Sequence, residues 1–130
     1  MVGKIPKKNK RPGVDGYGRT ALHYLDGNID ELIESGLDVN QPDDNGWSPL
    51  HFAVQENNFD AVVKLIKHGA DVSRCNSHGN NVLWVAVMNS QTKSPIIDLL
   101  LENGADPFFK NKSDVSAADL APEFFNAKKT

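Results

Sequence analysis

Apolar residues in the middle of the chain recur at helical spacing. Leu50, Ala53 and Val54 share one face of a helix, because residues three or four positions apart meet on successive turns. Ser48 and Pro49 suit the start of that helix, since a serine hydroxyl accepts an otherwise unpaired backbone N–H and proline at the first helical position loses no hydrogen bond. The pattern therefore predicts a helix that begins at Pro49.

A second helix is predicted after a polar break at residues 57–58. Its apolar stripe is made by Val62, Val63, Leu65 and Ile66. Gly69 is expected to end this helix in a left-handed conformation, because glycine has no Cβ to oppose a positive φ. Residues 71–72 then lead into an extended hairpin, in which Gly79 takes the positive φ of the turn. One unit thus comprises two antiparallel helices and a hairpin.

The same order of elements recurs along the chain. Three opening segments align, at residues 15–23 (DGYGRTALH), 43–51 (DDNGWSPLH) and 76–84 (NSHGNNVLW). Three closing segments also align, at residues 35–40 (SGLDVN), 68–73 (HGADVS) and 103–107 (NGADP). The spacing in the most regular part is 33 residues, as from Gly46 to Gly79. Units of this kind bury their apolar faces only by stacking on one another.

These segments resemble the ankyrin-repeat family, which has a period of about 33 residues and a T-P-L-H-x-A signature. The resemblance covers about residues 15–121 and implies an all-α solenoid of stacked helix-turn-helix units with β-hairpin turns. It divides the chain into a basic N-terminal tail (1–14), repeats at about 15–42, 43–75 and 76–110, a partial C-terminal cap (111–121) and a C-terminal tail (122–130).

Two repeats depart from the regular period. The distance from Gly18 to Gly46 is 28 residues, which predicts that the helices of repeat one have lost about five residues. The distance from Gly69 to Gly104 is 35, which predicts two extra residues around positions 90–95. Residues 111–121 match the beginning of a fourth repeat, which ends before its second helix.

The histidines are the first candidates for chemistry, but their positions favour other roles. His23 and His51 occupy the motif position that the resemblance assigns to hydrogen bonds between neighbouring turns, and Trp84 replaces the histidine in repeat three. His68 and His78 are expected to be solvated. The sequence contains no zinc-ligand spacing, nucleophile motif or phosphate loop, so we expect no enzyme, metal or cofactor.

Composition and charge narrow the class of protein. Hydrophobic residues make up 39% of the 130 positions and charged residues 24%, as in ordinary globular domains, and no apolar run is long enough to cross a bilayer. Cys75 is the lone cysteine and is expected to be inert; a disulfide within the chain is excluded, which favours the reducing cytoplasm. Residues 1–20 carry a net charge of +5 and the remainder −8, which argues against nucleic acid as the ligand.

The resemblance places partner binding on the hairpin tips and the inner helices, which together form a concave face. By position this selects Tyr17, Arg19, Asp44, Asn45, Trp47, Gln55, Glu56, Ser77, His78, Asn80, Met88 and Asn89. Trp47 stands at a position that the family pattern makes a solvent-facing tip, and tryptophan often dominates interfaces; the alternative is that it packs onto the neighbouring repeat. Acidic residues near the first two repeats, among them Asp43, are interpreted either as a solvated acidic surface or as part of a face that suits a partner with a basic surface.

Three functions follow as hypotheses. The first is a binding protein that masks or inhibits its partner through the concave face, and one version is a bacterial immunity protein that neutralises a toxin. The second is a regulatory scaffold or adaptor, which could use residues 1–11 as a nuclear import signal; a solvated tail is the alternative for that segment. The third, an enzyme, has no support beyond the histidines. The partner is therefore expected to be a protein, and we expect no small-molecule substrate, nucleic acid or membrane as a ligand.

Overall fold

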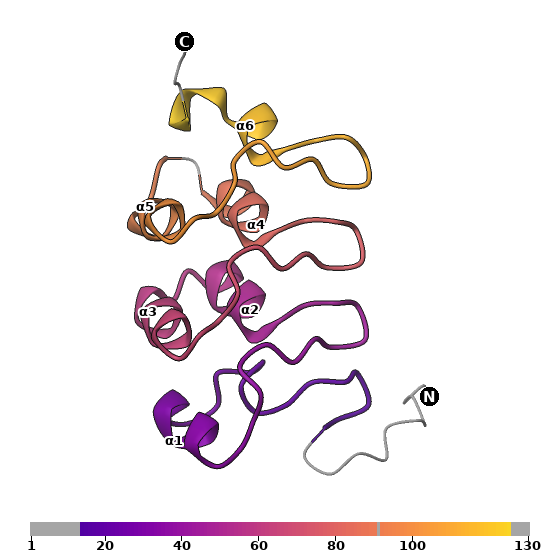
Figure 1. Ribbon diagram of the computed structural model, residues 1–130, viewed down its shortest axis with the longest axis vertical. Helices are drawn as coiled ribbons and strands as arrows, with labels where there is room; N and C mark the ends of the chain where they lie inside the picture. The colour runs from indigo at the N-terminus through magenta and orange to yellow at the C-terminus, as the bar shows by residue number, and fades with distance from the viewer. Residues whose placement is uncertain (1–13, 91, 126–130) are drawn as a thin grey trace.

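The computed structural model describes residues 14–90 and 92–125, which form successive layers stacked along the long axis of the molecule (Figure 1). Residues 1–13 of the predicted basic tail lie outside the described part, and the predicted bounds of the repeats and tails stay predictions. The elements follow one another as α1 (Ile29–Glu34), α2 (Pro49–Gln55), α3 (Phe59–Lys67), α4 (Val82–Asn89), α5 (Pro95–Glu102), α6 (Ala117–Leu120) and a 3-10 turn (Pro122–Phe124).

Hairpin loops project from one side of these layers, at residues 15–19, 43–47, 76–80 and 111–115 (Figure 1). Within the described residues the loops contain no β-strand, and a single β-bridge joins Cys75 to Asn81. The fold is therefore the all-α solenoid with hairpin turns that the sequence predicts. None of the helices in the described ranges is long and apolar enough to cross a membrane.

The helix boundaries of the regular repeat are set by local signals. The Oγ atom of Ser48 accepts the N–H of His51 at 3.3 Å, and Pro49 is the first residue of α2. Asn57 has a φ of 56° and interrupts the helical conformation between α2 and α3. Gly69 has a φ of 95° and follows the end of α3. The predicted start, break and end of these two helices are therefore confirmed.

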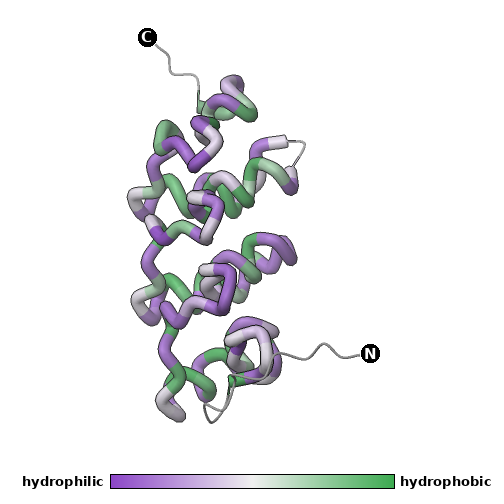
Figure 2. The backbone as a smooth tube through the Cα atoms, turned by 90° about the vertical axis from the view of Figure 1, so that its right-hand side faces the viewer, coloured by the Kyte–Doolittle hydropathy of each residue, from purple (hydrophilic) through white to green (hydrophobic). Residues whose placement is uncertain are grey.

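The core runs continuously through the layers, and hydrophobic positions occur along the whole stack (Figure 2). Leu50, Ala53 and Val54 of α2 are buried as predicted, and so are Val62 and Leu65 of α3. The prediction that Val63 belongs to the buried stripe is wrong, because its side chain is 37% exposed. Consecutive helical residues point about 100° apart, so Val62 and Val63 cannot both face the core fully.

Both irregular repeats differ from the regular one in the way their lengths predict. Residues 21–25 of repeat one form turns instead of an α-helix, and α1 has six residues where α3 has nine. In repeat three, α4 ends at Asn89 and α5 begins at Pro95, whereas α2 and α3 are separated by three residues. The missing residues thus come from the helices, and the extra ones lie in a connection.

A repeated carboxylate or amide side chain holds each hairpin loop. The Oδ1 atom of Asp43 accepts the N–H of Asn45 at 2.9 Å and the N–H of Trp47 at 2.8 Å. Asp15, Asn76 and Asn111 make the same pair of bonds in the other loops. The interpretation of Asp43 as part of a solvated acidic surface is therefore wrong, because this residue is 6% exposed and fixes a turn.

Backbone hydrogen bonds join each hairpin loop to the next, and we call this series of bonds the ladder. The N–H of Asp44 donates to the carbonyl of Tyr17 at 2.9 Å, and the N–H of Ser77 donates to the carbonyl of Asn45 at 2.9 Å. The N–H of Lys112 donates to the carbonyl of His78 at 3.1 Å and extends the ladder to the last loop. The loops therefore form one continuous edge, which fixes their spacing along the stack.

This close approach of the loops gives a matched pair of glycine substitutions. A Cβ at Gly46 would lie 2.9 Å from the backbone nitrogen of Ser77, whereas a Cβ at Gly69 would meet nothing within 4 Å. Both residues have positive φ, so Gly69→Ala should cost only the backbone strain of about 1–2 kcal/mol. In denaturant titrations we expect Gly46→Ala to lower the free energy of unfolding by about 1–3 kcal/mol beyond the loss caused by Gly69→Ala, because the added Cβ also pushes the two loops apart. Equal losses of stability in the two variants would mean that the loops can move apart at Gly46 without lowering the free energy of unfolding.

The two motif histidines bridge neighbouring layers as the resemblance implies. Nε2 of His23 donates to the carbonyl of Trp47 at 3.1 Å, and Nε2 of His51 donates to the carbonyl of Asn80 at 3.1 Å. In each ring Nδ1 accepts the backbone N–H of the residue three positions earlier, Thr20 or Ser48. Trp84 makes no such bond, and its buried Nε1 has no hydrogen-bond partner. These histidines are structural.

The expectation that His68 is solvated is wrong. Its Nε2 lies 2.6 Å from Oδ1 of Asp30, which belongs to α1 in the preceding layer. The side chain of His68 is half-buried by this contact, because α3 packs against the short α1. His78 does lie exposed in its hairpin loop, as expected.

Candidate protein-binding surface

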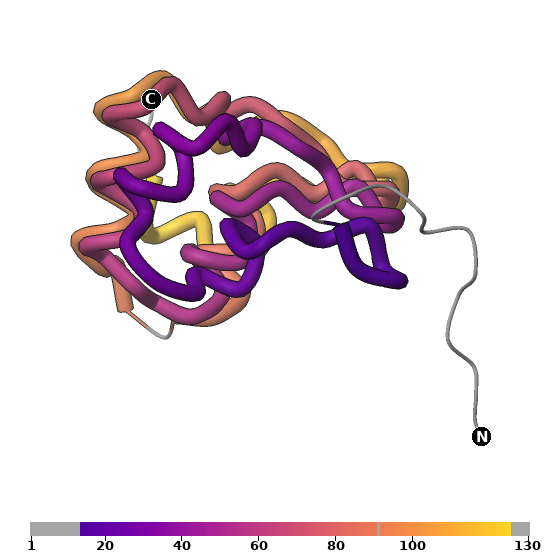
Figure 3. Tube along the Cα trace, turned by 90° about the horizontal axis from the view of Figure 1, so that it is seen from below, coloured from indigo at the N-terminus to yellow at the C-terminus, as the bar shows by residue number. Residues whose placement is uncertain are grey.

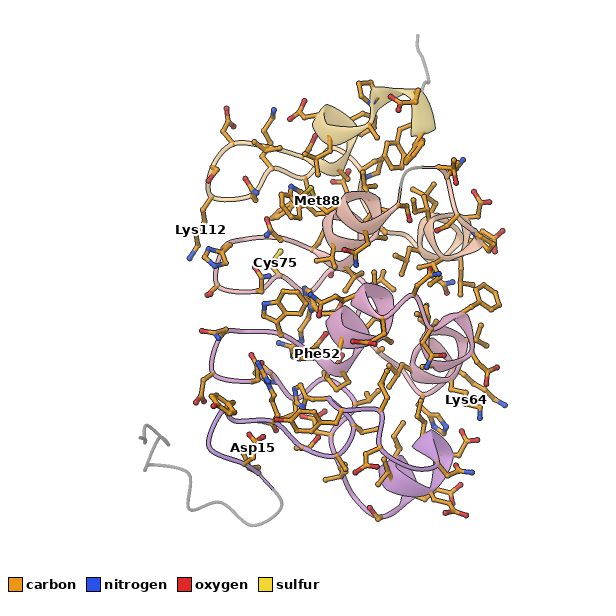
Figure 4. The ribbon with its side chains drawn as sticks, turned by 180° about the vertical axis from the view of Figure 1, so that it is seen from behind. Asp15, Phe52, Lys64, Cys75, Met88 and Lys112 are labelled. Carbon is orange, nitrogen blue, oxygen red and sulfur yellow. The ribbon has the colours of Figure 1, made fainter. Side chains whose placement is uncertain are left out.

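The face to which the resemblance assigns partner binding consists of the hairpin loops and the inner helices α2 and α4, and we call it the concave face. Figure 4 places Phe52 and Met88 on these inner helices, and Lys64 on the outer helix α3. Viewed along the stack, the loops gather on one side and the helices on the other (Figure 3). Because the ladder of backbone bonds fixes the loops, side chains from different repeats are displayed at constant intervals.

The residues that the sequence selects for partner binding all lie on these loops, on the inner helices or directly after them. Tyr17 is 55% exposed and Met88 is 56% exposed, so both present large apolar surfaces to solvent. Three of the selected side chains are instead half-buried: Arg19, Trp47 and Asn80. The remaining ones are exposed: Asp44, Asn45, Gln55, Glu56, Ser77, His78 and Asn89.

Trp47 does not occupy the solvent-facing tip that the family pattern suggests. Its ring centroid lies 5.2 Å from that of Phe52 and 5.4 Å from that of His51, so the side chain packs on α2 of its own repeat. The backbone N–H of Trp47 is bonded to Asp43, which turns the returning arm of the loop toward the helix. Asp44 and Asn45, which are both exposed, are the central residues of the turn that is closed by the hydrogen bond from the N–H of Gly46 to the carbonyl of Asp43 at 3.0 Å.

Arg19 links repeat one to repeat two. Its Nε donates to Oδ2 of Asp43 at 3.0 Å, and the side chain of Asp43 is only 1% exposed. The guanidinium carbon also lies 5.1 Å from the ring centroid of Tyr17 and 5.0 Å from that of Phe52. Removing Arg19 would leave a buried carboxylate without this partner, so the residue supports the stack as well as the surface.

Cys75 offers little reactivity. Burial raises the pKa of its thiol above the ordinary value, and the nearby Asp71 adds to the same effect. A higher thiol pKa leaves less thiolate, which is the nucleophilic form. This agrees with the interpretation of Cys75 as an inert residue.

A groove that the sequence interpretation missed lies between repeat one and repeat two. Its volume is about 790 Å³, and we call it the repeat-one groove. A smaller hollow of about 260 Å³ adjoins it and shares Phe52 and Gln55 with its lining. The repeat-one groove is lined by His23, Tyr24, Leu25, Phe52, Gln55, Glu56, Asn57, Asn58, Phe59 and Asp60. The signal that could have revealed it is the 28-residue spacing of repeat one.

These features define a class of protein, a repeat solenoid whose loops and inner helices form one continuous surface. Residues 25–111 match the ankyrin repeats in three copies. The chain belongs to the ankyrin-repeat family. Ankyrin repeats are in general non-enzymatic modules that bind other proteins, and this class of function applies to the domain.

Relatives of this chain are longer proteins. It is 38% identical over 92 residues to the palmitoyltransferase ZDHHC13 of Homo sapiens, across 70% of this chain and 14% of that protein. It is 42% identical over 62 residues to the neurogenic locus notch homolog protein 1 of Homo sapiens, across 48% of this chain and 2% of the other. The 2-5A-dependent ribonuclease of Mus musculus is 41% identical over 59 residues, across 45% of this chain and 8% of the enzyme. The chain thus spans a small part of each relative, and the similarity concerns the repeats.

Proposed function

We propose that the chain binds a protein partner with a basic surface through its concave face and thereby masks a functional surface of that partner. The observation that supports this most directly is the display of two large apolar side chains, Tyr17 and Met88, on a strongly acidic stack. All 17 Asp and Glu residues of the chain lie between positions 14 and 125, against 7 Lys and Arg residues there. Complementary charge would speed encounter, and the apolar side chains would hold the complex.

The test compares three forms of the full chain in affinity capture and in titration of the captured partner. Tyr17→Ala with Met88→Ala should weaken binding about tenfold or more, as expected for two anchoring side chains. Val63→Ala is the matched control, because Val63 is an exposed apolar residue on the outer helix α3. Trp47 is left intact, since its packing on Phe52 would confuse loss of binding with loss of folding. Equal affinity of all three forms would place binding away from the concave face.

One version of this function is an immunity protein that neutralises a basic toxin in a bacterium. The acidity of the stack supports it, because toxins that act on nucleic acids carry basic surfaces. Partner identification decides this version: a toxin whose activity falls on addition of the chain, and recovers with the double variant, would support it. A partner that keeps its activity in the complex would contradict it.

The second candidate is a regulatory adaptor that docks other proteins, in the cytoplasm or in the nucleus. Its support is the basic run of residues 1–11, which lies outside the described residues. Deleting these residues should move a fluorescent fusion between compartments if they act as an import signal. An unchanged distribution would remove the nuclear version.

A further inference from the structure

The repeat-one groove exists because repeat one lacks a full inner helix. Residues 21–25 form only turns, whereas the layer above carries the seven residues of α2. The end of α2 and the start of α3 therefore extend beyond their neighbour and leave residues 55–60 uncovered on that side. The groove therefore follows from the short repeat one of this chain.

The lining of the groove combines aromatic rings with negative charge. Tyr24 and Phe59 are exposed and Phe52 is half-buried, while Glu56 and Asp60 supply two exposed carboxylates. None of the ten lining residues is a lysine or an arginine. Nε2 of His23 already donates to a backbone carbonyl, and burial lowers the pKa of this ring, so it remains neutral near pH 7.

The charged groups next to the lining leave this negative character in place. Arg19 packs 5.0 Å from the ring of Phe52 and 5.9 Å from that of Tyr24, but its charge is compensated by Asp43 at 3.0 Å. Nζ of Lys64 lies 3.9 Å from Oδ2 of Asp60, an exposed contact one helical turn away that a competing cation can replace. Glu56 has no such lysine among the ion pairs of the described residues.

We propose that the repeat-one groove binds a lysine or arginine side chain of the partner protein. The aliphatic stem would lie against Phe52 and Phe59, and the charged head would meet the ring of Tyr24 and the carboxylates of Glu56 and Asp60. This inference rests on the proposed function, since it supplies the contact by which a basic partner is recognised next to Tyr17. The contact favours a cationic head, because the carboxylates of Glu56 and Asp60 attract a positive charge and gain nothing from a neutral side chain.

The direct test uses two small probes of nearly identical shape. N-acetyl-arginine methylamide and its citrulline counterpart differ in charge, and each is titrated into the full isotope-labelled chain while amide resonances are recorded. The arginine probe should shift the resonances of residues 24–25 and 55–60 and bind at least fivefold more tightly than the citrulline probe. Equal binding of the two probes, shifts confined to other residues, or no shifts at all would overturn the assignment.

Variants of the groove add a second measurement. Glu56→Gln with Asp60→Asn removes both charges at exposed positions, so the fold should be retained and binding of the arginine probe should weaken at least fivefold. Glu102→Gln, an exposed carboxylate on α5, is the matched control and should leave probe binding unchanged. If both variants behave as the unaltered chain does, the carboxylates of the groove play no part.

Two further outcomes separate the alternatives. If the arginine probe binds only after Lys7, Lys8 and Lys10 are all changed to glutamate in the full chain, the chain's own basic tail is the occupant and the partner assignment is wrong. If the partner is lost by the Tyr17 and Met88 double variant but kept with unchanged affinity by the Glu56 and Asp60 double variant, the concave face functions and the groove does not. Loss of partner affinity in both double variants supports both proposals.

Discussion

Leu50→Ala should lower the free energy of unfolding by about 2–5 kcal/mol, the usual cost of removing a fully buried leucine side chain. Leu50 is 1% exposed in α2, which packs against α3 of its own repeat and α4 of the next. The cavity would therefore lie where two layers meet. Because each layer is stable only through its neighbours, a loss there weakens the whole stack, and we expect a cooperative transition at lower denaturant.

The control for this prediction is Val63→Ala on the outer helix α3. Val63 is 37% exposed, so its truncation should cost less than about 1 kcal/mol, in the range of surface changes. Denaturant titration of both variants by circular dichroism gives the two values under the same conditions. A loss for Leu50→Ala as small as that for Val63→Ala would mean that α2 does not carry the core at this position.

Mild acid should destabilise the chain through His51. Burial lowers the pKa of His51 from its ordinary value of 6.5 to about 4. Between these two values the unfolded chain binds a proton that the folded chain does not, so the free energy of unfolding falls as the pH falls. Integrated from pH 7 to pH 5, this one ring should cost about 2 kcal/mol. His23, whose pKa burial also lowers, acts in the same direction.

The variant His51→Gln isolates this effect. Glutamine does not titrate, and at the third helical position it can still accept the N–H of Ser48 as His51 does. The variant should be less stable at pH 7 and should lose less stability on going to pH 5 than the unaltered chain. The window stays above the ordinary carboxylate range near pKa 4, so aspartates contribute little to the comparison. Parallel slopes for the two proteins would show that His51 does not remain neutral when folded.

The short repeat one lowers stability but opens the repeat-one groove. Shortening repeat one removes apolar packing and so costs stability, but it also opens space beside Phe52 and Phe59 that a regular layer would fill. The same region carries the ion pair of Arg19 with Asp43 and the contact of His68 with Asp30, which tie the short layer to the next one. A binding site at this junction would combine the shape of the groove with the negative charge of Glu56 and Asp60.

The sequence by itself determined the repeat, its period and the ends of its helices. Ser48 caps α2, Asn57 breaks it from α3 and Gly69 ends α3 because these signals act over a few neighbouring residues. The shortening of repeat one was also readable, because its 28-residue spacing departs from the 33-residue period. The role of His51 followed from the resemblance of its motif to the ankyrin family. Local chemistry and periodicity need no knowledge of how the layers are rotated against one another.

Only the tertiary structure decided how side chains from different layers meet. Asp43 is buried because Arg19, 24 residues earlier, lies against it, and His68 is held by Asp30, 38 residues earlier. The repeat-one groove likewise depends on what a missing helix leaves uncovered in the next layer. Such contacts are set by the stacking geometry, which no spacing in the sequence specifies.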